Sequence, residues 1–282
     1  KSNLLQGVNV ALKAVSTKTT LPILECILLE ANNNTITLTA NDMELGIETT
    51  IDGSIQEPGK IALNAKLFSE IVRKLPDNDV NIQTNSSHQA IIHCEKSKFT
   101  ISGQAGDDFP LLPEIERLQS ITISQFTLKE VIRQTIFSIS DNENTKLMTG
   151  ELFDISNDQL RVVSLDGHRI SIRNIELKDR YENIKVVVPG KTLSDLSKIL
   201  NGGTEDEVHI YFTSKHILFD FDQTIVVSRL LEGDYYNIDQ MLSTDYETKI
   251  QINKKEFLNC IDRASLLIRE SDKKPIVINI QD

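Results

Sequence analysis

The segment Asn64-Ala-Lys-Leu-Phe-Ser-Glu-Ile71 recurs later in the chain as Pro189-Gly-Lys-Thr-Leu-Ser-Asp-Leu196. The lysines that the two segments share, Lys66 and Lys191, are 125 positions apart. Self-similarity at one fixed period indicates a repeat protein, in which each copy is a structural unit. This repeat decides the fold that the sequence predicts.

Other segments keep nearly the same spacing. Leu24-Glu-Cys-Ile-Leu-Leu-Glu30 aligns with Met148-Thr-Gly-Glu-Leu-Phe-Asp154, which lies 124 positions further on. Leu5 and Leu128, 123 positions apart, each belong to a helical stretch that opens a copy. The agreement along the whole length of the copy makes a chance similarity of short segments a poor explanation.

A third copy of the opening helix begins at Glu256-Phe-Leu-Asn-Cys-Ile-Asp-Arg-Ala264. We therefore predict three domains, at residues 1–120, 121–246 and 247–282. Because a copy needs about 125 residues, we expect the third domain to be incomplete, with roughly 90 residues absent.

Each copy alternates helices with short strands. The first helix, near residues 3–15, and the second, near 65–75, each carry an apolar face, formed by Leu4, Leu5, Val8, Leu12 and Val15 and by Leu67, Phe68, Ile71, Val72 and Leu75. Runs such as Thr35–Thr39, Val80–Thr84 and Ala90–His93 have the composition of antiparallel strands. The pattern predicts an α+β fold, with two helices packed on antiparallel sheet in each domain.

The charge is distributed unevenly. The chain of 282 residues has 30 basic and 41 acidic residues, a net charge of −11, which argues against a protein that coats nucleic acid. The five predicted helical segments (2–18, 64–75, 127–139, 190–200 and 254–268) nevertheless sum to +7. Two interpretations stay open from charge alone: a positive surface for phosphates, or ordinary solvated helix faces.

Nothing in the composition indicates a membrane or an oxidising compartment. No apolar run approaches the roughly 18 residues of a membrane span. The cysteines Cys26, Cys94 and Cys260 are far apart in the sequence, so we expect them to be reduced and structural, as in a cytosolic protein.

Several local signatures resemble those of the bacterial β sliding clamp family, the β subunits of DNA polymerase III, over essentially the whole chain. They are Thr20-Leu-Pro-Ile-Leu24, Gly106-Asp-Asp-Phe-Pro110, Leu165-Asp-Gly-His-Arg169, Glu232-Gly-Asp-Tyr235 and Arg263-Ala-Ser-Leu-Leu267, in the family's order and spacing. The resemblance implies a head-to-tail homodimeric ring of three similar domains per subunit, with helices lining the hole. The ring encircles DNA and holds the replicative polymerase on it, so this chain is expected to be a processivity factor truncated in its third domain.

The resemblance also implies site residues and partners. Lys18, Arg73, Asn142 and Lys146 occupy DNA-facing positions. A groove for partner peptides is expected at Met148, Leu165, Gly167, His168, Arg169, Ile170, Tyr236, Gln240 and Met241, and a dimer interface at Ile71, Phe99, Ile101, Leu266 and Leu267. The implied partners are double-stranded DNA bound without sequence specificity, the DNA polymerase III α subunit, the clamp loader, other proteins with a clamp-binding motif, and a second copy of the protein when complete. The five interface residues could equally belong to the cores of their own domains.

Two rival classes of protein compete with the clamp. Val188-Pro-Gly-Lys-Thr192 resembles the end of a phosphate-binding loop, but Lys185 stands where that loop needs glycine. The histidines form no cluster with metal-ligand spacing, so we expect no catalytic site, metal or cofactor. The second rival is a repeat scaffold that binds protein peptides without encircling DNA. The acidic composition permits it, and the basic helices argue against it.

Overall fold

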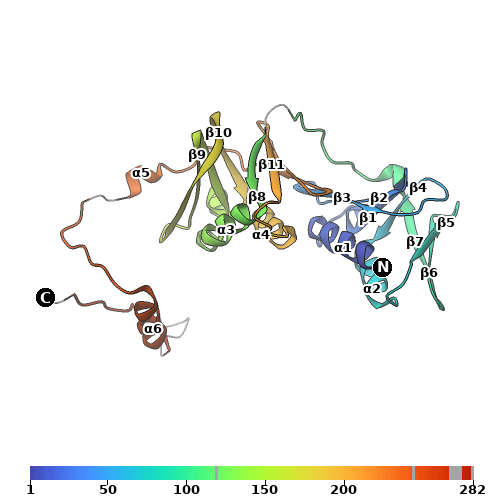
Figure 1. Ribbon diagram of the computed structural model, residues 1–282, viewed down its shortest axis with the longest axis horizontal. Helices are drawn as coiled ribbons and strands as arrows, with labels where there is room; N and C mark the ends of the chain where they lie inside the picture. The colour runs from blue at the N-terminus through green and yellow to red at the C-terminus, as the bar shows by residue number, and fades with distance from the viewer. Residues whose placement is uncertain (118–119, 243–244, 267–274, 281–282) are drawn as a thin grey trace. The chain divides into compact units, whose positions relative to one another are not determined.

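The computed structural model describes residues 1–117, 120–242, 245–266 and 275–280 (Figure 1). Its contacts divide the chain into two compact units, Lys1–Tyr235 and Tyr236–Asp282. The first unit contains the first two copies of the repeat.

The first repeat is an α+β unit. Its helices are α1 (Ser2–Ala11) and α2 (Ala65–Lys74), accompanied by the 3₁₀ turns η1 (Leu12–Ala14), η2 (Pro22–Glu25) and η3 (Gly106–Asp108). Its strands are β1 (Cys26–Asn32), β2 (Thr35–Asn41), β3 (Leu45–Asp52), β4 (Gly59–Asn64), β5 (Asn81–Thr84), β6 (Gln89–Cys94) and β7 (Ser97–Ala105).

The second repeat follows the same order with longer strands. Its helices are α3 (Gln125–Thr135) and α4 (Gly190–Ile199), with the 3₁₀ turns η4 (Ile136–Ser138) and η5 (Glu143–Thr149). Its strands are β8 (Ile121–Ser124), β9 (Gly150–Leu165), β10 (Ile170–Pro189), β11 (Glu207–Phe212), β12 (His216–Phe221) and β13 (Thr224–Arg229). By their position in the repeat, β9 covers the counterparts of β1 and β2, and β10 those of β3 and β4.

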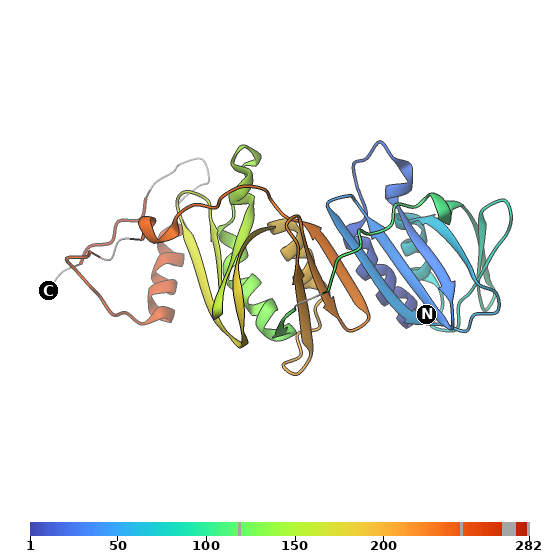
Figure 2. The same cartoon turned by 90° about the horizontal axis from the view of Figure 1, so that it is seen from above.

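The strands form antiparallel sheet throughout the described residues. One sheet has the order β5-β6-β7-β4-β1-β2-β3-β13-β12-β11-β8, and β9 and β10 form a second, two-stranded sheet. In residues 1–235, helices α1 to α4 lie on the same side of the sheet (Figure 1), and a view from above looks onto the strands with the helices behind them (Figure 2). The core lies between these layers, with Val8, Phe68, Leu128 and Leu193 fully buried in it. The predicted α+β architecture is confirmed.

Local capping explains where two of the helices begin. The Asn64 side chain accepts a hydrogen bond from the backbone N–H of Leu67 at 3.1 Å, and Ser124 accepts one from the N–H of Thr127 at 3.1 Å. A side-chain oxygen at this position satisfies a backbone donor that has no partner within the helix. Both helices thus begin within two residues of the predicted starts.

One predicted core residue is exposed. Leu67, expected on the apolar face of α2, is 46% exposed, whereas its neighbour Phe68 is fully buried. Successive residues of an α-helix are rotated by about 100°, so Leu67 points away from the face on which Phe68 and Val72 pack.

The burial pattern corrects the spacing of the opening helices. Leu4, Gly7, Val8 and Ala11 are the buried positions of α1, and Leu128, Val131, Ile132 and Thr135 are the matching buried positions of α3. The true offset is therefore 124, and Leu128 is the counterpart of Leu4 rather than of Leu5. Two adjacent leucines in the first copy made the prediction one residue off.

The two repeats are joined edge to edge. Strands β3 and β13 pair from Leu45↔Ser228 to Thr49↔Thr224, so the sheet continues from one repeat into the next. Ile47 and Val226, which face each other in this pairing, are each only 1% exposed. We call this contact the joint. Lys191 at the start of α4 reaches across it to Asp42, with a distance of 2.8 Å between Nζ and Oδ2.

The second unit contains the short helix α5 (Ile238–Met241) and the helix α6 (Lys254–Ser265). Asn253 caps α6, accepting hydrogen bonds from the backbone N–H groups of Lys255 and Glu256 at 3.0 and 3.1 Å. None of the residues of α6 is buried. Cys260, which we expected to be structural, is exposed, whereas Cys26 and Cys94 are buried free thiols. Among the described residues, no helix combines the length and apolarity needed to cross a bilayer.

Candidate functional site

The expected DNA-facing residues lie in helix α2, in the 3₁₀ turn η5 and in the loops next to η1 and η5. Arg73 is exposed in the last turn of α2, and Lys18 is exposed in the loop that follows η1. Lys146 is exposed within η5. Asn142 is exposed, but its side chain also caps η5 by accepting a hydrogen bond from the N–H of Asn144 at 3.0 Å. Asn142 therefore has a structural task besides any contact with a ligand.

Lys18 and Asn142 occupy the same place in their repeats. In the first repeat the N–H of Ser16 donates to the carbonyl of Leu24 at 3.1 Å, and in the second the N–H of Ser140 donates to the carbonyl of Met148 at 2.8 Å. The two donor residues are 124 positions apart in the sequence, and so are the two acceptor residues. The loop that presents Lys18 is thus built by the same backbone contact as the loop that presents Asn142.

The expected peptide-groove residues of the second repeat surround one turn. Asp166 Oδ1 accepts hydrogen bonds from the backbone N–H groups of His168 and Arg169 at 3.0 and 3.2 Å, and Oδ2 pairs with Arg169 Nε at 2.8 Å. The His168 N–H and the Arg169 side chain hold the pKa of Asp166 below its ordinary value. Gly167 has a φ of +89°, which favours glycine.

Leu165 and Ile170 flank that turn, and Met148 lies in η5. Leu165 is buried at the end of β9, Ile170 is half-buried at the start of β10, and Met148 is half-buried at the end of η5. His168 is exposed. The Arg169 guanidinium lies 5.9 Å from the centre of the Phe137 ring, which is itself 57% exposed. Tyr236, Gln240 and Met241 belong to the second unit, where Gln240 and Met241 are exposed and Tyr236 is half-buried.

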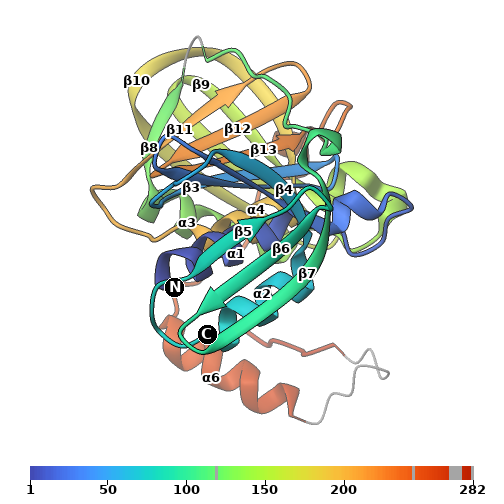
Figure 3. The ribbon, with the colours of Figure 1, turned by 90° about the vertical axis from the view of Figure 1, so that its right-hand side faces the viewer.

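The expected interface residues differ in accessibility. Ile71 and Ile101 are 7% and 8% exposed and belong to the core of the first unit. Phe99 is 39% exposed on β7, one of three strands that lie side by side at the end of the first repeat (Figure 3). Leu266 is 79% exposed after α6. Leu267 lies outside the described residues.

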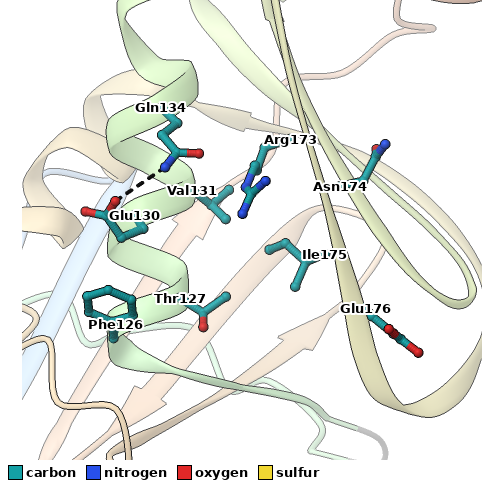
Figure 4. Close-up of a pocket in the computed structure, with 9 residues that line it drawn as sticks. All are labelled: Phe126, Thr127, Glu130, Val131, Gln134, Arg173, Asn174, Ile175 and Glu176. Carbon is teal, nitrogen blue, oxygen red and sulfur yellow. Dashed lines mark hydrogen bonds between the residues drawn. The ribbon is translucent and has the colours of Figure 1, made fainter.

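A cavity of about 320 Å³ lies between α3 and the first part of β10 (Figure 4). Its walls are Phe126, Thr127, Glu130, Val131 and Gln134 from the helix and Arg173, Asn174, Ile175 and Glu176 from the strand. No corresponding cavity was predicted. In the first repeat the counterparts of Val131 and Ile175 are Gly7 and Ile51, and a Cβ on Gly7 would lie 3.2 Å from Ile51 Cγ2. Gly7 has no side chain to separate α1 from β3, whereas Val131 contributes a side chain to the wall of the cavity between α3 and β10.

A second feature that the sequence prediction missed is the carboxyl of Glu151, which is fully buried beneath α3. Oε2 accepts a hydrogen bond from the Thr135 hydroxyl at 3.1 Å, while Oε1 has no hydrogen-bond partner among the described residues. Burial raises the pKa of Glu151 to about 8, although the hydrogen bond from Thr135 opposes this. The aligned segments at 24–30 and 148–154 already placed Glu151 opposite Ile27, which was the available signal.

Within the described parts of the chain, no group of three or more His, Cys, Asp or Glu side chains is arranged to hold a metal ion. The candidate functional features are therefore the basic helices, the joint between the two repeats and the polar turn at residues 166–169.

Comparison with protein families identifies the two repeats separately. Residues 1–113 match the N-terminal domain of the DNA polymerase III beta subunit, and residues 122–237 match its central domain. The chain belongs to the DNA polymerase III β subunit family. This membership confirms the resemblance found in the sequence, and with it the interpretation of the chain as a non-catalytic clamp subunit.

Individual relatives agree with the family assignment. The proteins named beta sliding clamp from Staphylococcus epidermidis and Staphylococcus aureus are each 39% identical over 283 and 282 residues, covering 98% and 97% of this chain. The chain spans about three quarters of their length, 75% and 74% respectively.

Solved structures show the same similarity. A crystal structure assigned as a DNA polymerase III beta subunit from Eubacterium rectale is 65% identical, with a TM-score of 0.96, and the match covers 100% of this chain and 76% of the other. The DNA polymerase sliding clamp of Bacillus subtilis is 38% identical, with a TM-score of 0.92 and coverage of 96% and 73%.

Proposed function

We propose that this β subunit encircles duplex DNA in a head-to-tail homodimeric ring and tethers the replicative polymerase to it. The joint carries the proposal. It connects two repeats into one continuous sheet while keeping four helices on one side, and a connection of this kind can be used again by each further repeat. A ring built in this way would turn its basic helices toward the phosphates and would bind DNA without reading its sequence.

The domain boundaries, the cellular location and the protein partners are part of the same proposal. The domains would comprise residues 1–120, 121–246 and 247–282, and the protein would work in the cytoplasm. Its partners would be the DNA polymerase III α subunit, the clamp loader and other proteins that carry a clamp-binding motif.

The exposure and hydrogen bonds of the proposed site residues limit what each of them can contact. Lys18, Arg73 and Lys146 are exposed, and Asn142 can offer DNA only the hydrogen-bonding groups that its cap leaves available. The turn at 166–170, with Met148 and Leu165, would form one wall of the peptide groove, to which Tyr236, Gln240 and Met241 would be added. On the side of the first repeat, Phe99 is the strongest candidate for the dimer interface, because Ile71 and Ile101 are buried in the core; Leu266 and Leu267 would form the other side.

Charge reversal tests the DNA-facing layer. Lys18→Glu combined with Arg73→Glu should weaken loading onto DNA, because two phosphate contacts are replaced by repulsion. Binding of a clamp-motif peptide should not change, since that groove is formed by other residues. Lys96→Glu combined with Lys215→Glu, in the turns β6–β7 and β11–β12, makes the same change of charge at residues outside the helices. Loading that is equally affected in both variants would contradict the assignment.

A further inference from the structure

We infer that the phosphate-binding charge of this protein is concentrated on the helices of the first repeat, and that those of the second repeat contribute little. This inference rests on the proposed function, since it concerns which part of the helical layer meets the DNA. The observation behind it is a difference in ion pairing between two otherwise similar repeats.

Four cations border the helices of the first repeat: Lys13 and Lys18 after α1, and Arg73 and Lys74 at the end of α2. Lys18, Arg73 and Lys74 are exposed, and Lys13 is half-buried. In the described part of the chain, none of these four side chains forms an ion pair with a carboxylate. Their charges are therefore available to an external anion.

The matching positions of the second repeat are different. Phe137 stands in the place of Lys13, Asn142 in that of Lys18, and Ile199 in that of Lys74. Only Arg73 has a basic counterpart, Lys198, and its Nζ lies 2.9 Å from Asp195 Oδ1. Three cations have thus been lost between the repeats, and the fourth is neutralised by a carboxylate one turn away.

The other cations of the second pair of helices are also engaged. Arg133 forms a two-point contact with Glu130, at 2.8 and 2.7 Å, and lowers the pKa of that carboxyl. Lys129 Nζ donates to the carbonyl of Leu200 at 2.9 Å. Lys191 is bound across the joint to Asp42, whereas its counterpart Lys66 is exposed and has no ion pair within the described residues. Lys146, in η5, has no ion pair within the described residues.

These ion pairs determine how much net positive charge each repeat presents to a DNA phosphate. At physiological salt, charges beyond roughly 8–10 Å are largely screened, so a phosphate responds to the local sum of charge. A cation with a carboxylate at under 3 Å offers little net charge to that sum, and it must give up its partner before it can replace a counterion of the DNA. The first repeat therefore offers five cations without an ion pair, one of which is offset by the exposed Glu70. The second repeat offers mainly Lys129 and Lys146.

Salt dependence measures these contacts directly. Each cation that neutralises a phosphate adds about 0.9 to the slope of log K against log salt. The 282-residue chain, with a fluorescent duplex as probe, would be compared with Lys18→Gln/Arg73→Gln and with Arg133→Gln/Lys198→Gln. Both double variants remove two positive charges from exposed side chains, so a general effect of net charge would alter them equally.

The first-repeat variant is expected to lower the slope by about 1.8, and the second-repeat variant by less than half of that. Glu130→Gln/Asp195→Gln, which releases Arg133 and Lys198, is expected to steepen the slope. Equal losses in the two cationic variants, or no change on removal of the two acids, would overturn the inference while leaving the clamp function intact. A parent chain without salt-dependent binding to duplex DNA would also overturn the inference, whereas encirclement is tested separately by retention on circular DNA.

Discussion

At the scale of single residues, the two repeats differ most clearly beneath their opening helices. Ala11, Ala14, Ile27 and Ala40 form part of the apolar core of the first repeat. Their counterparts, each 124 positions later, are the buried polar residues Thr135, Ser138, Glu151 and Ser164. Ser164 donates a hydrogen bond to the carbonyl of Thr135 at 2.6 Å, and Thr135 contacts Glu151. The second repeat has thus replaced an apolar cluster with a polar one.

This replacement should make stability depend on pH through Glu151. The unfolded chain ionises this carboxyl with a pKa near 4.5, whereas the folded protein keeps it protonated up to about pH 8. Ionisation therefore stabilises the unfolded state as pH rises through this window, and the folded state loses up to about 5 kcal/mol relative to low pH. Glu151→Gln, which cannot ionise, should gain stability over the parent protein as pH rises from 4.5 to 8.

Urea unfolding at the two ends of this window measures the difference in free energy. Glu57→Gln, at an exposed position, controls for the loss of one negative charge. A difference between Glu151→Gln and its parent that is the same at both pH values would show that the carboxyl is not kept protonated by the fold.

At the scale of elements, the approach of each opening helix to its sheet depends on one position. A Cβ on Gly7 would lie 3.1 Å from Leu38 Cδ1 and 3.2 Å from Ile51 Cγ2. Gly7→Val, which introduces the residue found at 131, should therefore push α1 away from β3 at a cost of about 1–3 kcal/mol. Denaturant unfolding would measure the cost.

Gly59→Val is the matched control, because a Cβ at Gly59 would have no heavy atom within 4 Å. A cost at Gly7 no greater than at Gly59 would mean that the contact between α1 and β3 can adjust freely. The cavity beside Val131 would then need another cause.

The joint should owe its stability to apolar packing and not to its ion pair. Ile47 is buried opposite Val226, so Ile47→Ala should cost about 2–5 kcal/mol. The Lys191 side chain is 66% exposed in its pair with Asp42, so Lys191→Ala should cost less than about 1 kcal/mol. Thermal and urea unfolding of the two variants would show the order, and a larger loss for Lys191→Ala would contradict it.

The sequence predicted the elements well because periodicity and capping are local. Asn64 and the apolar residues that follow it identify α2, and the lysines at 66 and 191 align the second helices of the two repeats. Burial of a particular atom depends on neighbours distant in sequence. The close packing at Gly7, the exposure of Leu67 and the burial of Glu151 were therefore missed, even though the alignment of Glu151 with Ile27 gave a partial signal. The pairing of Lys191 with Asp42 across the joint was inaccessible for the same reason.

At the scale of the whole molecule, the negative net charge conceals the positive charge that is gathered at the helices. The chain has a charge of −11, yet its helical layer carries the exposed cations Lys18, Arg73, Lys74 and Lys146. A protein that depended on affinity alone would need a much larger basic surface to remain on DNA at physiological salt. The proposed ring would remove this requirement through topological linkage, because a closed ring stays on DNA while each phosphate contact remains weak and the ring remains free to slide.

The most direct test of this account is retention on circular DNA. The protein, loaded by its clamp loader onto a nicked circle, would be separated from free protein by gel filtration before and after one cut that makes the DNA linear. The account predicts retention on the circle and release from the linear form, because only a topological link is broken by the cut. Equal retention on both forms would contradict encirclement and would favour ordinary surface binding.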